Sequence, residues 1–283
     1  MLLNRRDLGG LVAAGVVARR RGPSPRAPEP PAPAKEPNLA RILRTKKLRV
    51  AAFAGQEPYW YKDPSSGQWA GFCLTMARNL AAELGVEVAV SETEWADTVT
   101  DLHTGKLDLA YGPSPTAQRA MFADFANPLF FDTYAFIARK GFAPKSWDEI
   151  NTAQTLVAVD IGSAREDAAR RFANNAAITG FKTRDEALLA VQSGRDDCFP
   201  ATVLLALAVL KKNPQLGELL VPTPHLRVAV CPAVPYDDDL RFRGVVDAWD
   251  EEHRGTGEIR AWIVAALAKL GVEPRDLPPD ISF

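Results

Sequence analysis

Apolar positions recur with two different periods along most of the chain, one typical of helices and the other of strands. The order of these segments predicts strands and helices that alternate along the sequence. Residues 74–85, LTMARNLAAELG, place apolar side chains at helical spacing, so they predict a helix that stops at Gly85. Residues 86–93, VEVAVSET, alternate as a strand does. A strand is predicted for residues 48–54, and a helix, a glycine turn and a strand for residues 95–112. This first half is typical of an α/β domain with a largely parallel sheet.

The same pattern starts again after residue 134. Residues 134–141, YAFIARKG, form an extended apolar stretch, and Ser146 with Glu149 three residues later predicts a capped helix start. Further strand-and-helix pairs follow up to residue 212. Two similar α/β units in one chain indicate two lobes with a cleft between them, where ligand sites are often found. We assign residues 38–138 and 234–283 to the first lobe and residues 139–233 to the second.

The N-terminus has the layout of an export signal followed by a linker. Arg5 and Arg6 precede a short segment rich in glycine and alanine, which is too short to span a membrane. This pair resembles the twin-arginine class of signals, so we expect residues 1–21 to direct export to the periplasm. A basic tail without structure is the alternative. Residues 22–37, GPSPRAPEPPAPAKEP, are rich in proline and predict an extended linker.

Charge and cysteine content exclude several classes of function. The formal net charge of -1 gives no field that would draw the chain onto nucleic acid or an anionic membrane. Cys73, Cys198 and Cys231 form no CxxC pair, and the three histidines are scattered, so we expect no metal site and no cofactor. Buried thiols are the expected state of the cysteines. A disulfide between Cys198 and Cys231 is the alternative.

Two short turns carry candidate binding chemistry. Residues 112–119, GPSPTAQR, end in Arg119, whose planar guanidinium can grip a carboxylate through two parallel hydrogen bonds. A surface arginine paired with Asp124 is the alternative. Residues 161–165, IGSAR, lie between a predicted strand and a predicted helix, where small residues let a ligand approach and a helix N-terminus favours an anion. A plain tight turn is the alternative there.

An ordered series of segments resembles a known family. The series runs through LRVAAFA, PYWY, GQWAGF, LAAELGVEV, GKLDLAYG, TAQR, DFANPLFF and GTGEIRAWI, between residues 46 and 270. It resembles the extracytoplasmic solute-binding proteins of amino-acid ABC importers, bacterial solute-binding protein family 3. The resemblance implies an α/β fold of the two-lobed periplasmic binding protein type II, each lobe a mostly parallel sheet flanked by helices, joined by a two-strand hinge. It also implies a non-catalytic monomer that captures a small carboxylate-bearing solute, an amino acid, derivative or organic acid, and delivers it to an ABC permease.

The resemblance also assigns ligand-binding residues. Arg119 would take the carboxylate, with Thr116 and the preceding turn completing the clamp. Trp95 falls where the family often places an aromatic side chain on the ligand, although ordinary core packing is the alternative. Tyr59 and Trp60 are expected to add aromatic contacts. The predicted set is Gln56, Trp95, Pro113, Ser114, Thr116, Arg119, Gly162, Ser163, Ala164 and Thr202, with no catalytic residue.

The chain departs from the family's pattern where relatives hold the ligand's ammonium group. The expected acid of the second lobe is Thr202 here, whereas Asp197 matches an earlier acid that is interpreted as structural. Another family acid falls near Phe53. Because a hydroxyl cannot neutralise a buried ammonium group, our hypothesis is a ligand with an acidic group but no standard ammonium. Glu57 or Glu94 in place of the missing acid is the alternative.

Two other functions remain open at this point. Some relatives are dehydratases of cyclic carboxylic acids, and such an enzyme needs a general acid or base in the cleft. His103 is poorly placed for that role, and Arg165 and the two glutamates above form no convincing pair. The other alternative is an accessory or sensor protein that serves an exported oxidoreductase or a membrane receptor.

Overall fold

The structure is a computed structural model that describes residues 36–63 and 65–278. The predicted export signal, and all but the last two residues of the predicted linker, lie outside these residues. From Glu36 onward the chain forms a single unit. Within the described ranges, no helix is both long enough and apolar enough to cross a membrane.

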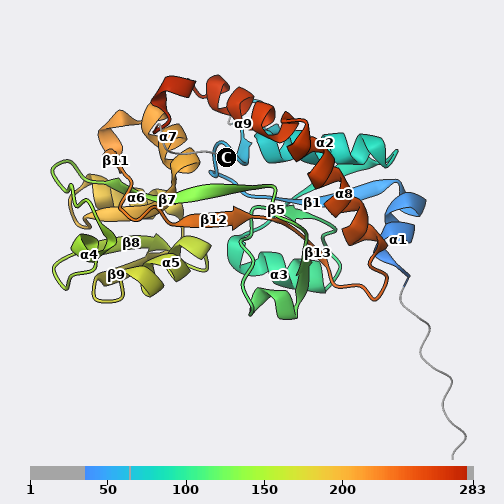
Figure 1. Cartoon of the computed structure of the whole chain (residues 1–283), viewed down its shortest axis with the longest axis horizontal. Helices are drawn as coiled ribbons and strands as arrows, with labels where there is room; N and C mark the ends of the chain where they lie inside the picture. The colour runs from blue at the N-terminus through green and yellow to red at the C-terminus, as the bar shows by residue number, and fades with distance from the viewer. Residues whose placement is uncertain (1–35, 64, 279–283) are drawn as a thin grey trace, which may run out of the picture. The chain divides into compact units, whose positions relative to one another are not determined.

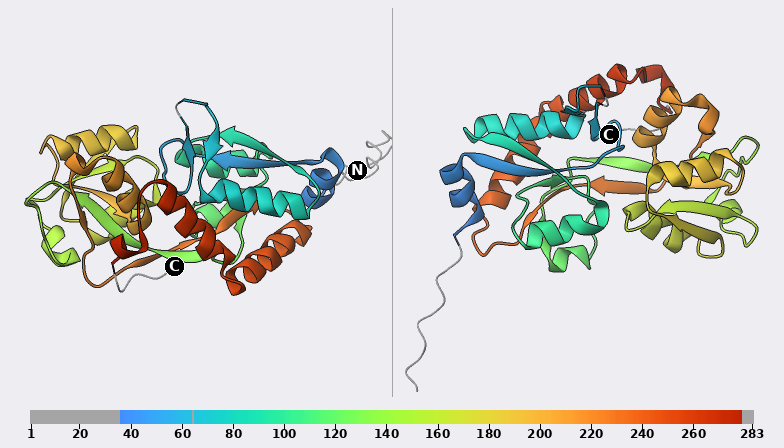
Figure 2. Two further views of the ribbon diagram at one scale, coloured as in Figure 1. Left: turned by 90° about the horizontal axis from the view of Figure 1, so that it is seen from above. Right: turned by 180° about the vertical axis from the view of Figure 1, so that it is seen from behind.

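The first lobe combines the N-terminal part of the described chain with its C-terminal helices (Figure 1). Its elements are α1 (Asn38–Thr45), β1 (Lys47–Ala52), β2 (Tyr61–Lys62), β3 (Trp69–Ala70), α2 (Phe72–Glu83), β4 (Glu87–Glu92), α3 (Trp95–His103), β5 (Ala110–Tyr111), the short η1 (Arg119–Met121), β6 (Ala123–Phe125), β13 (Pro232–Pro235), α8 (Arg241–Gly255), α9 (Glu258–Lys269) and η3 (Pro274–Asp276). Helices α2, α8 and α9 lie on one side of the lobe and α3 on the other (Figure 2).

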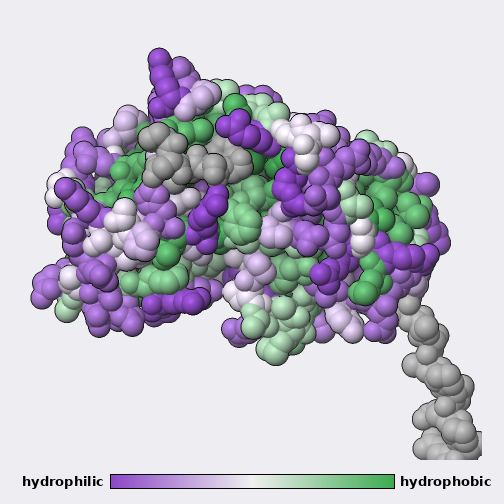
Figure 3. All heavy atoms as spheres, in the orientation of Figure 1, coloured by the Kyte–Doolittle hydropathy of each residue, from purple (hydrophilic) through white to green (hydrophobic). Residues whose placement is uncertain are grey.

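The second lobe is made from the middle of the chain. Its elements are β7 (Phe130–Ala138), α4 (Trp147–Ile150), β8 (Leu156–Asp160), α5 (Ala164–Phe172), β9 (Ala177–Phe181), α6 (Arg184–Gln192), β10 (Cys198–Thr202), α7 (Val203–Lys212), η2 (Pro214–Leu216), β11 (Glu218–Leu220) and β12 (Arg227–Val230). Charged and polar side chains cover much of the molecular face in Figure 3, with apolar patches between them.

Parallel and antiparallel strand pairs occur in both lobes, whereas mostly parallel sheets were expected. In the first lobe β1 and β4 are parallel, whereas β13 lies antiparallel between β5 and β6. In the second lobe β9, β8 and β10 are parallel, whereas β7 lies antiparallel between β10 and β11. The antiparallel pairs arise because β7 and β13 belong to the two passages of the chain between the lobes, which enter the sheets against the direction of their neighbours. The α/β fold class itself is as predicted.

Two antiparallel strands form the passage between the lobes. β12 pairs with the first half of β7, with Arg227 opposite Thr133 and Val230 opposite Phe130. The second half of β7 pairs with β10 and β11 of the second lobe. Figure 1 shows β7 and β12 side by side between the two lobes. The lobe boundary that the sequence predicts after residue 138 therefore falls at the end of β7, beyond the segment that pairs with β12.

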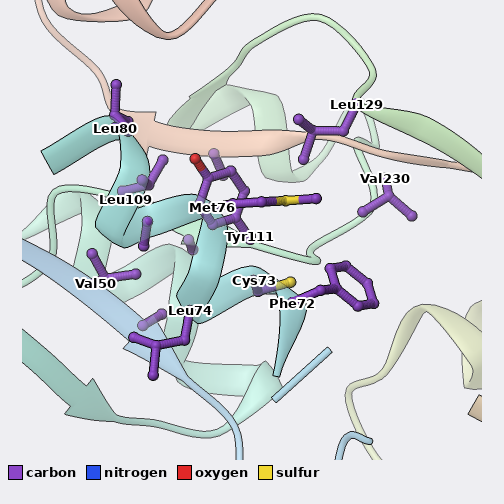
Figure 4. Close-up of a cluster of buried hydrophobic side chains, with 14 of the residues drawn as sticks. Val50, Phe72, Cys73, Leu74, Met76, Leu80, Leu109, Tyr111, Leu129 and Val230 are labelled. Atoms are coloured by element: carbon purple, nitrogen blue, oxygen red, sulfur yellow. The ribbon is translucent and has the colours of Figure 1, made fainter. Parts of the chain in front are cut away.

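Each lobe is built around buried apolar side chains. The core of the first lobe gathers Val50, Leu74 and Leu80 with Tyr111 and other residues from both passages of the chain (Figure 4). In the second lobe, one cluster packs α6 and α7 on the sheet and another packs α4 and α5 on the sheet. Burial of apolar surface on both faces of the sheet explains why the central strands β8 and β10 are nearly all apolar.

Helix ends follow local capping chemistry. The Ser146 hydroxyl accepts a hydrogen bond from the backbone N–H of Glu149 at 3.2 Å, which confirms the predicted cap of α4. Helix α2 ends at Glu83 with Leu84 as its C-cap, and Gly85 follows with a φ of 63°, as the glycine stop predicts. A full capping box of Thr183 and Glu186 starts α6, which we did not predict.

All three cysteines are buried free thiols, so the alternative of a Cys198–Cys231 disulfide is wrong. Burial raises the pKa of Cys73 and Cys198 well above the ordinary value and the pKa of Cys231 to about 11. Since the thiolate is the nucleophile, these side chains are inert while the protein is folded.

We therefore expect no reaction of the native protein with Ellman's reagent at pH 8, and reaction of all three thiols after unfolding in guanidinium chloride. The absorbance of the released thiolate measures both. Labelling of one thiol in the native state would contradict the burial of Cys73, Cys198 and Cys231. Fewer than three thiols after unfolding without reductant would contradict their free state.

Candidate functional site

A cavity of about 50 Å³ lies between the two lobes. The outline of the molecule is indented at the lower edge between α5 and α3 (Figure 3). The cavity is lined by Gln56, Tyr59, Trp95, Gly112, Pro113, Ser114 and Arg119, by Tyr134, Val228 and Val230 of the strands β7 and β12, and by Ser163, Ala164, Arg165, Thr202 and Leu205 of the second lobe. Two of these side chains are charged, Arg119 and Arg165, and both are cations.

Arg119 holds its guanidinium group between the lobes. Its Nη1 donates to the carbonyl oxygen of Ser114 at 3.1 Å, and its Nη2 donates across the cleft to the carbonyl oxygen of Gly162 at 3.3 Å. The backbone N–H of Arg119 donates to the Thr116 hydroxyl at 3.2 Å, which fixes the turn. Desolvation lowers the pKa of Arg119, although the charge of Asp167 opposes this shift. Arg119 is thus a half-buried cation held by neutral carbonyl groups.

Trp95 forms one wall of the cavity because its neighbours fix the ring. The indole lies on the ring of Phe53, with centroids 3.9 Å apart and planes 8° apart. Gly112 has a φ of 118°, and a Cβ there would come within 3.0 Å of the Trp95 ring. Glycine is therefore required at position 112, both for the backbone conformation and for the approach of the ring. The guanidinium carbon of Arg165 is 6.0 Å from the centre of the same ring.

The turn at residues 161–165 forms the opposite side of the cavity. Ser163 is the N-cap of α5, and its hydroxyl accepts a hydrogen bond from the backbone N–H of Glu166 at 3.1 Å. Gly162 has a φ of 79°, and a Cβ there would lie 3.1 Å from the Cβ of Ala96 in the other lobe. The absence of a side chain at position 162 thus lets the lobes approach each other, and the positive end of the α5 dipole lies at the cavity.

Arg165 is paired, in contrast to Arg119. Its guanidinium forms an ion pair with the buried carboxylate of Asp160, which also accepts a hydrogen bond from the Ser163 hydroxyl at 2.8 Å. Burial would raise the pKa of Asp160, but the charge and hydrogen bond of Arg165 outweigh it and keep this pKa below its ordinary value. The pair is therefore neutral overall, and Arg119 supplies the uncompensated charge of the cavity.

A buried carboxylate lies behind the floor of the cavity. Asp132 of β7 accepts hydrogen bonds from the Tyr59 hydroxyl and, at 2.7 Å, from the backbone N–H of Thr133. The Thr202 hydroxyl also interacts with both Tyr59 and Asp132. Burial raises the pKa of Asp132 and, together with the charge of Asp132, raises the pKa of Tyr59 well above its ordinary value. Tyr59 and Thr202 line the cavity and Asp132 does not.

Eight of the ten predicted site residues line this cavity, and two do not. Thr116 and Gly162 support Arg119 instead, one through its hydroxyl and the other through its carbonyl oxygen. The side chain of Arg119 does not pair with Asp124, which lies on β6. These positions agree with the predicted clamp, while the ligand contacts themselves stay a prediction.

Several other candidates lie elsewhere. Trp60 is fully buried and donates to the carbonyl oxygen of Tyr111, so it is a core residue. Glu57 forms an ion pair with Arg184 across the lobes at 3.0 Å, and Asp197 accepts from Arg139 and from the backbone of the second sheet. His103 packs edge-on against Phe122, and Glu94 precedes α3 outside the cavity.

Sequence reasoning missed the cavity walls that come from β7, β12 and α7. Tyr134, Val228, Val230 and Leu205 line the cavity, and burial raises the pKa of Tyr134. The pairing of Tyr134 with Thr202 in adjacent strands brings them together. The period of two along a strand puts Tyr134 on the same face of β7 as Asp132, so the polar run of residues 132–134 within an otherwise apolar strand was the available signal. In the described ranges, no group of three or more histidine, cysteine or acidic residues could hold a metal ion.

Comparison with known proteins adds a family match that covers most of the chain. The family model described as bacterial extracellular solute-binding proteins, family 3, matches residues 48–270. Cyclohexadienyl dehydratase from Pseudomonas aeruginosa is 26% identical over 219 residues, which is 76% of this chain and 81% of that protein. The ABC transporter glutamine-binding protein GlnH from Bacillus subtilis is 26% identical over 198 residues, which is 68% of this chain and 72% of that protein.

Solved structures give the same result for the fold. The crystal structure of the ancestral amino acid-binding protein AncCDT-1, a precursor of cyclohexadienyl dehydratase, superimposes with a TM-score of 0.72 and 26% identity. The alignment covers 83% of this chain and 99% of that one. The described lobes therefore correspond to a complete copy of that two-lobed structure.

Proposed function

Because the chain belongs to the bacterial extracellular solute-binding proteins, family 3, we propose that it captures a small carboxylate-bearing solute between its lobes and delivers it to an ABC permease. The similarity to an ABC transporter glutamine-binding protein supports the transport role. We further propose that the protein acts as a monomer in the periplasm. Residues 1–21, with their twin-arginine-like pair, would direct its export.

The observation that carries this proposal is the state of Arg119. Its guanidinium group is half-buried in the cavity between the lobes, and its described partners are two backbone carbonyl groups. A carboxylate is the planar, charged partner that such a group binds most strongly. The N-terminus of α5 on the other side favours the same anion.

The two strands that connect the lobes, β7 and β12, would let the lobes separate so that the solute can enter and leave. The closed cavity measures only about 50 Å³, so the solute enters when the lobes separate. β7 and β12 are the strands about which such a motion turns. Closure then brings Ser163 and Arg165 onto a solute already held by Arg119.

Dehydration is the second candidate, because cyclohexadienyl dehydratase is among the relatives. Loss of water requires a group that protonates the leaving hydroxyl. Apart from the arginines, the titratable side chains that line the cavity are Tyr59 and Tyr134, and burial raises the pKa of both. Neither tyrosine is an effective acid near neutral pH, so the cavity supports binding better than dehydration.

A thermal-shift screen of the purified full-length chain tests the proposal. The panel contains amino acids, organic acids and aromatic acids, and a solute that binds the folded state raises the Tm by mass action. We expect at least one small carboxylate to raise the Tm and to be recovered unchanged after incubation. If no carboxylate in the panel shifts the Tm, a role in solute capture is wrong. Conversion of a cyclic acid would favour the dehydratase.

A further inference from the structure

We infer that the solute is an organic acid without an amine, held by its carboxylate at Arg119 and by an uncharged remainder against the other walls of the cavity. This inference rests on the proposed function and adds the chemical class of the solute. It follows from two observations: the charged side chains that line the cavity are both arginines, and nearby carboxylates pair with other groups of the protein.

Three acidic side chains near the cavity are committed to partners within the protein. Glu57 pairs with Arg184 at 3.0 Å, and both side chains are largely buried. Asp160 pairs with Arg165, and Asp132 accepts the Tyr59 hydroxyl. None of the three carboxylates is among the residues that line the cavity. The alternative in which Glu57 replaces a missing acid is therefore not supported by its geometry.

The surfaces beside Arg119 are uncharged. Thr202 and Tyr134 present hydroxyl-bearing side chains, and Leu205, Val228 and Val230 present apolar ones. Hydroxyl groups suit a keto or hydroxyl oxygen of a solute, and the apolar side chains suit a short hydrocarbon remainder. A 2-oxo or 2-hydroxy acid matches this combination.

An amino acid would bring an ammonium group into the same space. It would meet two guanidinium groups and no carboxylate, and its own hydration would be lost. A buried charge without a partner weakens binding by two orders of magnitude or more, so we expect the deaminated analogue to bind at least about 100-fold more tightly than the amino acid.

The carboxylate of Asp132 interacts with two residues that line the cavity, Tyr59 and Thr202. It is buried, and Tyr59 and Thr202 stand between it and the cavity. Its oxygens accept hydrogen bonds from the Tyr59 hydroxyl and the Thr133 N–H, so an ammonium group would compete with donors already in place.

Calorimetric titration of the full chain with matched solutes tests the inference. The sets are alanine with lactate and pyruvate, valine with its 2-oxo acid, and phenylalanine with phenylpyruvate. We expect at least one of the 2-oxo or 2-hydroxy acids to bind, and the affinity for its matched amino acid to be at least about 100-fold lower. Amino-acid binding that equals or exceeds that of the analogues overturns the inference but leaves the proposed function intact. If no member of these sets and no carboxylate of the thermal-shift panel binds, the proposed function fails and the inference fails with it.

A pair of variants at Thr202 gives a second, independent test. Thr202 is the N-cap of α7, where aspartate and asparagine are both favoured, so T202D and T202N are expected to fold. The two differ by one charge at nearly equal size. We expect T202D to shift the preference towards the amino acid by at least about tenfold relative to T202N. Equal preferences in the two variants overturn the inference. The inference is also overturned if the wild type binds an amino acid and D132N does not. Asp132 would then be the residue that binds the ammonium group.

Discussion

Replacement of Arg119 by alanine is expected to weaken solute binding about 100-fold or more and to leave the fold intact. The guanidinium of Arg119 is the uncompensated charge of the cavity, and loss of one partner of a buried, hydrogen-bonded charge pair costs about 2–5 kcal/mol. In the protein itself Arg119 bonds two carbonyl oxygens at 3.1 and 3.3 Å. Since removal of a desolvated cation offsets the loss of these bonds, the Tm should change little. Calorimetry and thermal unfolding measure the two effects.

R119K is the matched variant. Lysine keeps the positive charge but not the planar fork, so we expect a loss smaller than in R119A and larger than zero. R165A provides a comparison within the same cavity, because Arg165 is already neutralised by Asp160. Its effect on the affinity should be smaller than that of R119A. An R119A protein that binds as tightly as the wild type would show that Arg119 is not the carboxylate clamp.

Replacement of Asp250 by asparagine is expected to stabilise the fold strongly at alkaline pH. Asp250 of α8 is completely buried, and neither of its oxygens has a hydrogen-bond partner in the described part of the chain. The same holds for the hydroxyl of Tyr111, which is buried in the first-lobe core (Figure 4). Burial, with a smaller contribution from the charge of Asp247, raises the pKa of Asp250 to about 8, although Arg254 opposes this shift.

The direction of the pH dependence follows from this pKa. Below pH 4 the carboxyl is protonated in both the folded and the unfolded chain and contributes no difference. Between pH 4 and about pH 8 the unfolded chain releases the proton while the folded chain retains it, so the free energy of unfolding falls by about 1.4 kcal/mol per pH unit. The asparagine variant has no proton to release at this site. Its advantage should therefore be near zero at pH 4 and reach several kcal/mol at pH 8.

Thermal unfolding at pH 4 and pH 8 measures this advantage. For a domain of this size a gain of several kcal/mol corresponds to roughly 10 °C in Tm. E251Q is the control, because Glu251 lies next to Asp250 on α8 but is exposed and paired with Arg254. It removes one negative charge and should leave the Tm nearly unchanged. An equal Tm difference between D250N and the wild type at both pH values would contradict a raised pKa.

The elements of the fold were predictable because their signals are local. Helix α2 follows from the apolar spacing of residues 74–85, and the turn after it follows from a glycine with positive φ. The turn that carries Arg119 and the turn at residues 161–165 were also predictable, because each is contiguous in sequence. Residues within one short turn need no tertiary information to be placed together.

The remaining site residues depend on contacts between distant segments. Tyr134 reaches the cavity because β7 pairs with β10, and Glu57 is withdrawn from it by Arg184, 127 positions later in the chain. The family resemblance predicted that Thr116 takes part in the carboxylate clamp. Its hydroxyl instead accepts from the backbone of Arg119, since threonine readily bonds to nearby backbone groups in turns. The two long-range contacts, of β7 with β10 and of Glu57 with Arg184, have no signal in the sequence next to these residues.

The placement of Trp95 has a consequence for spectroscopy. Of the six tryptophans, Trp95 alone is among the residues that line the cavity, whereas Trp60, Trp147 and Trp249 are buried elsewhere. Its indole is fixed against Phe53 and faces the guanidinium of Arg165. A solute placed between these groups alters the surroundings of one emitting ring out of six. The protein thus carries an intrinsic fluorescent reporter at its cleft, with the other five rings as an internal reference.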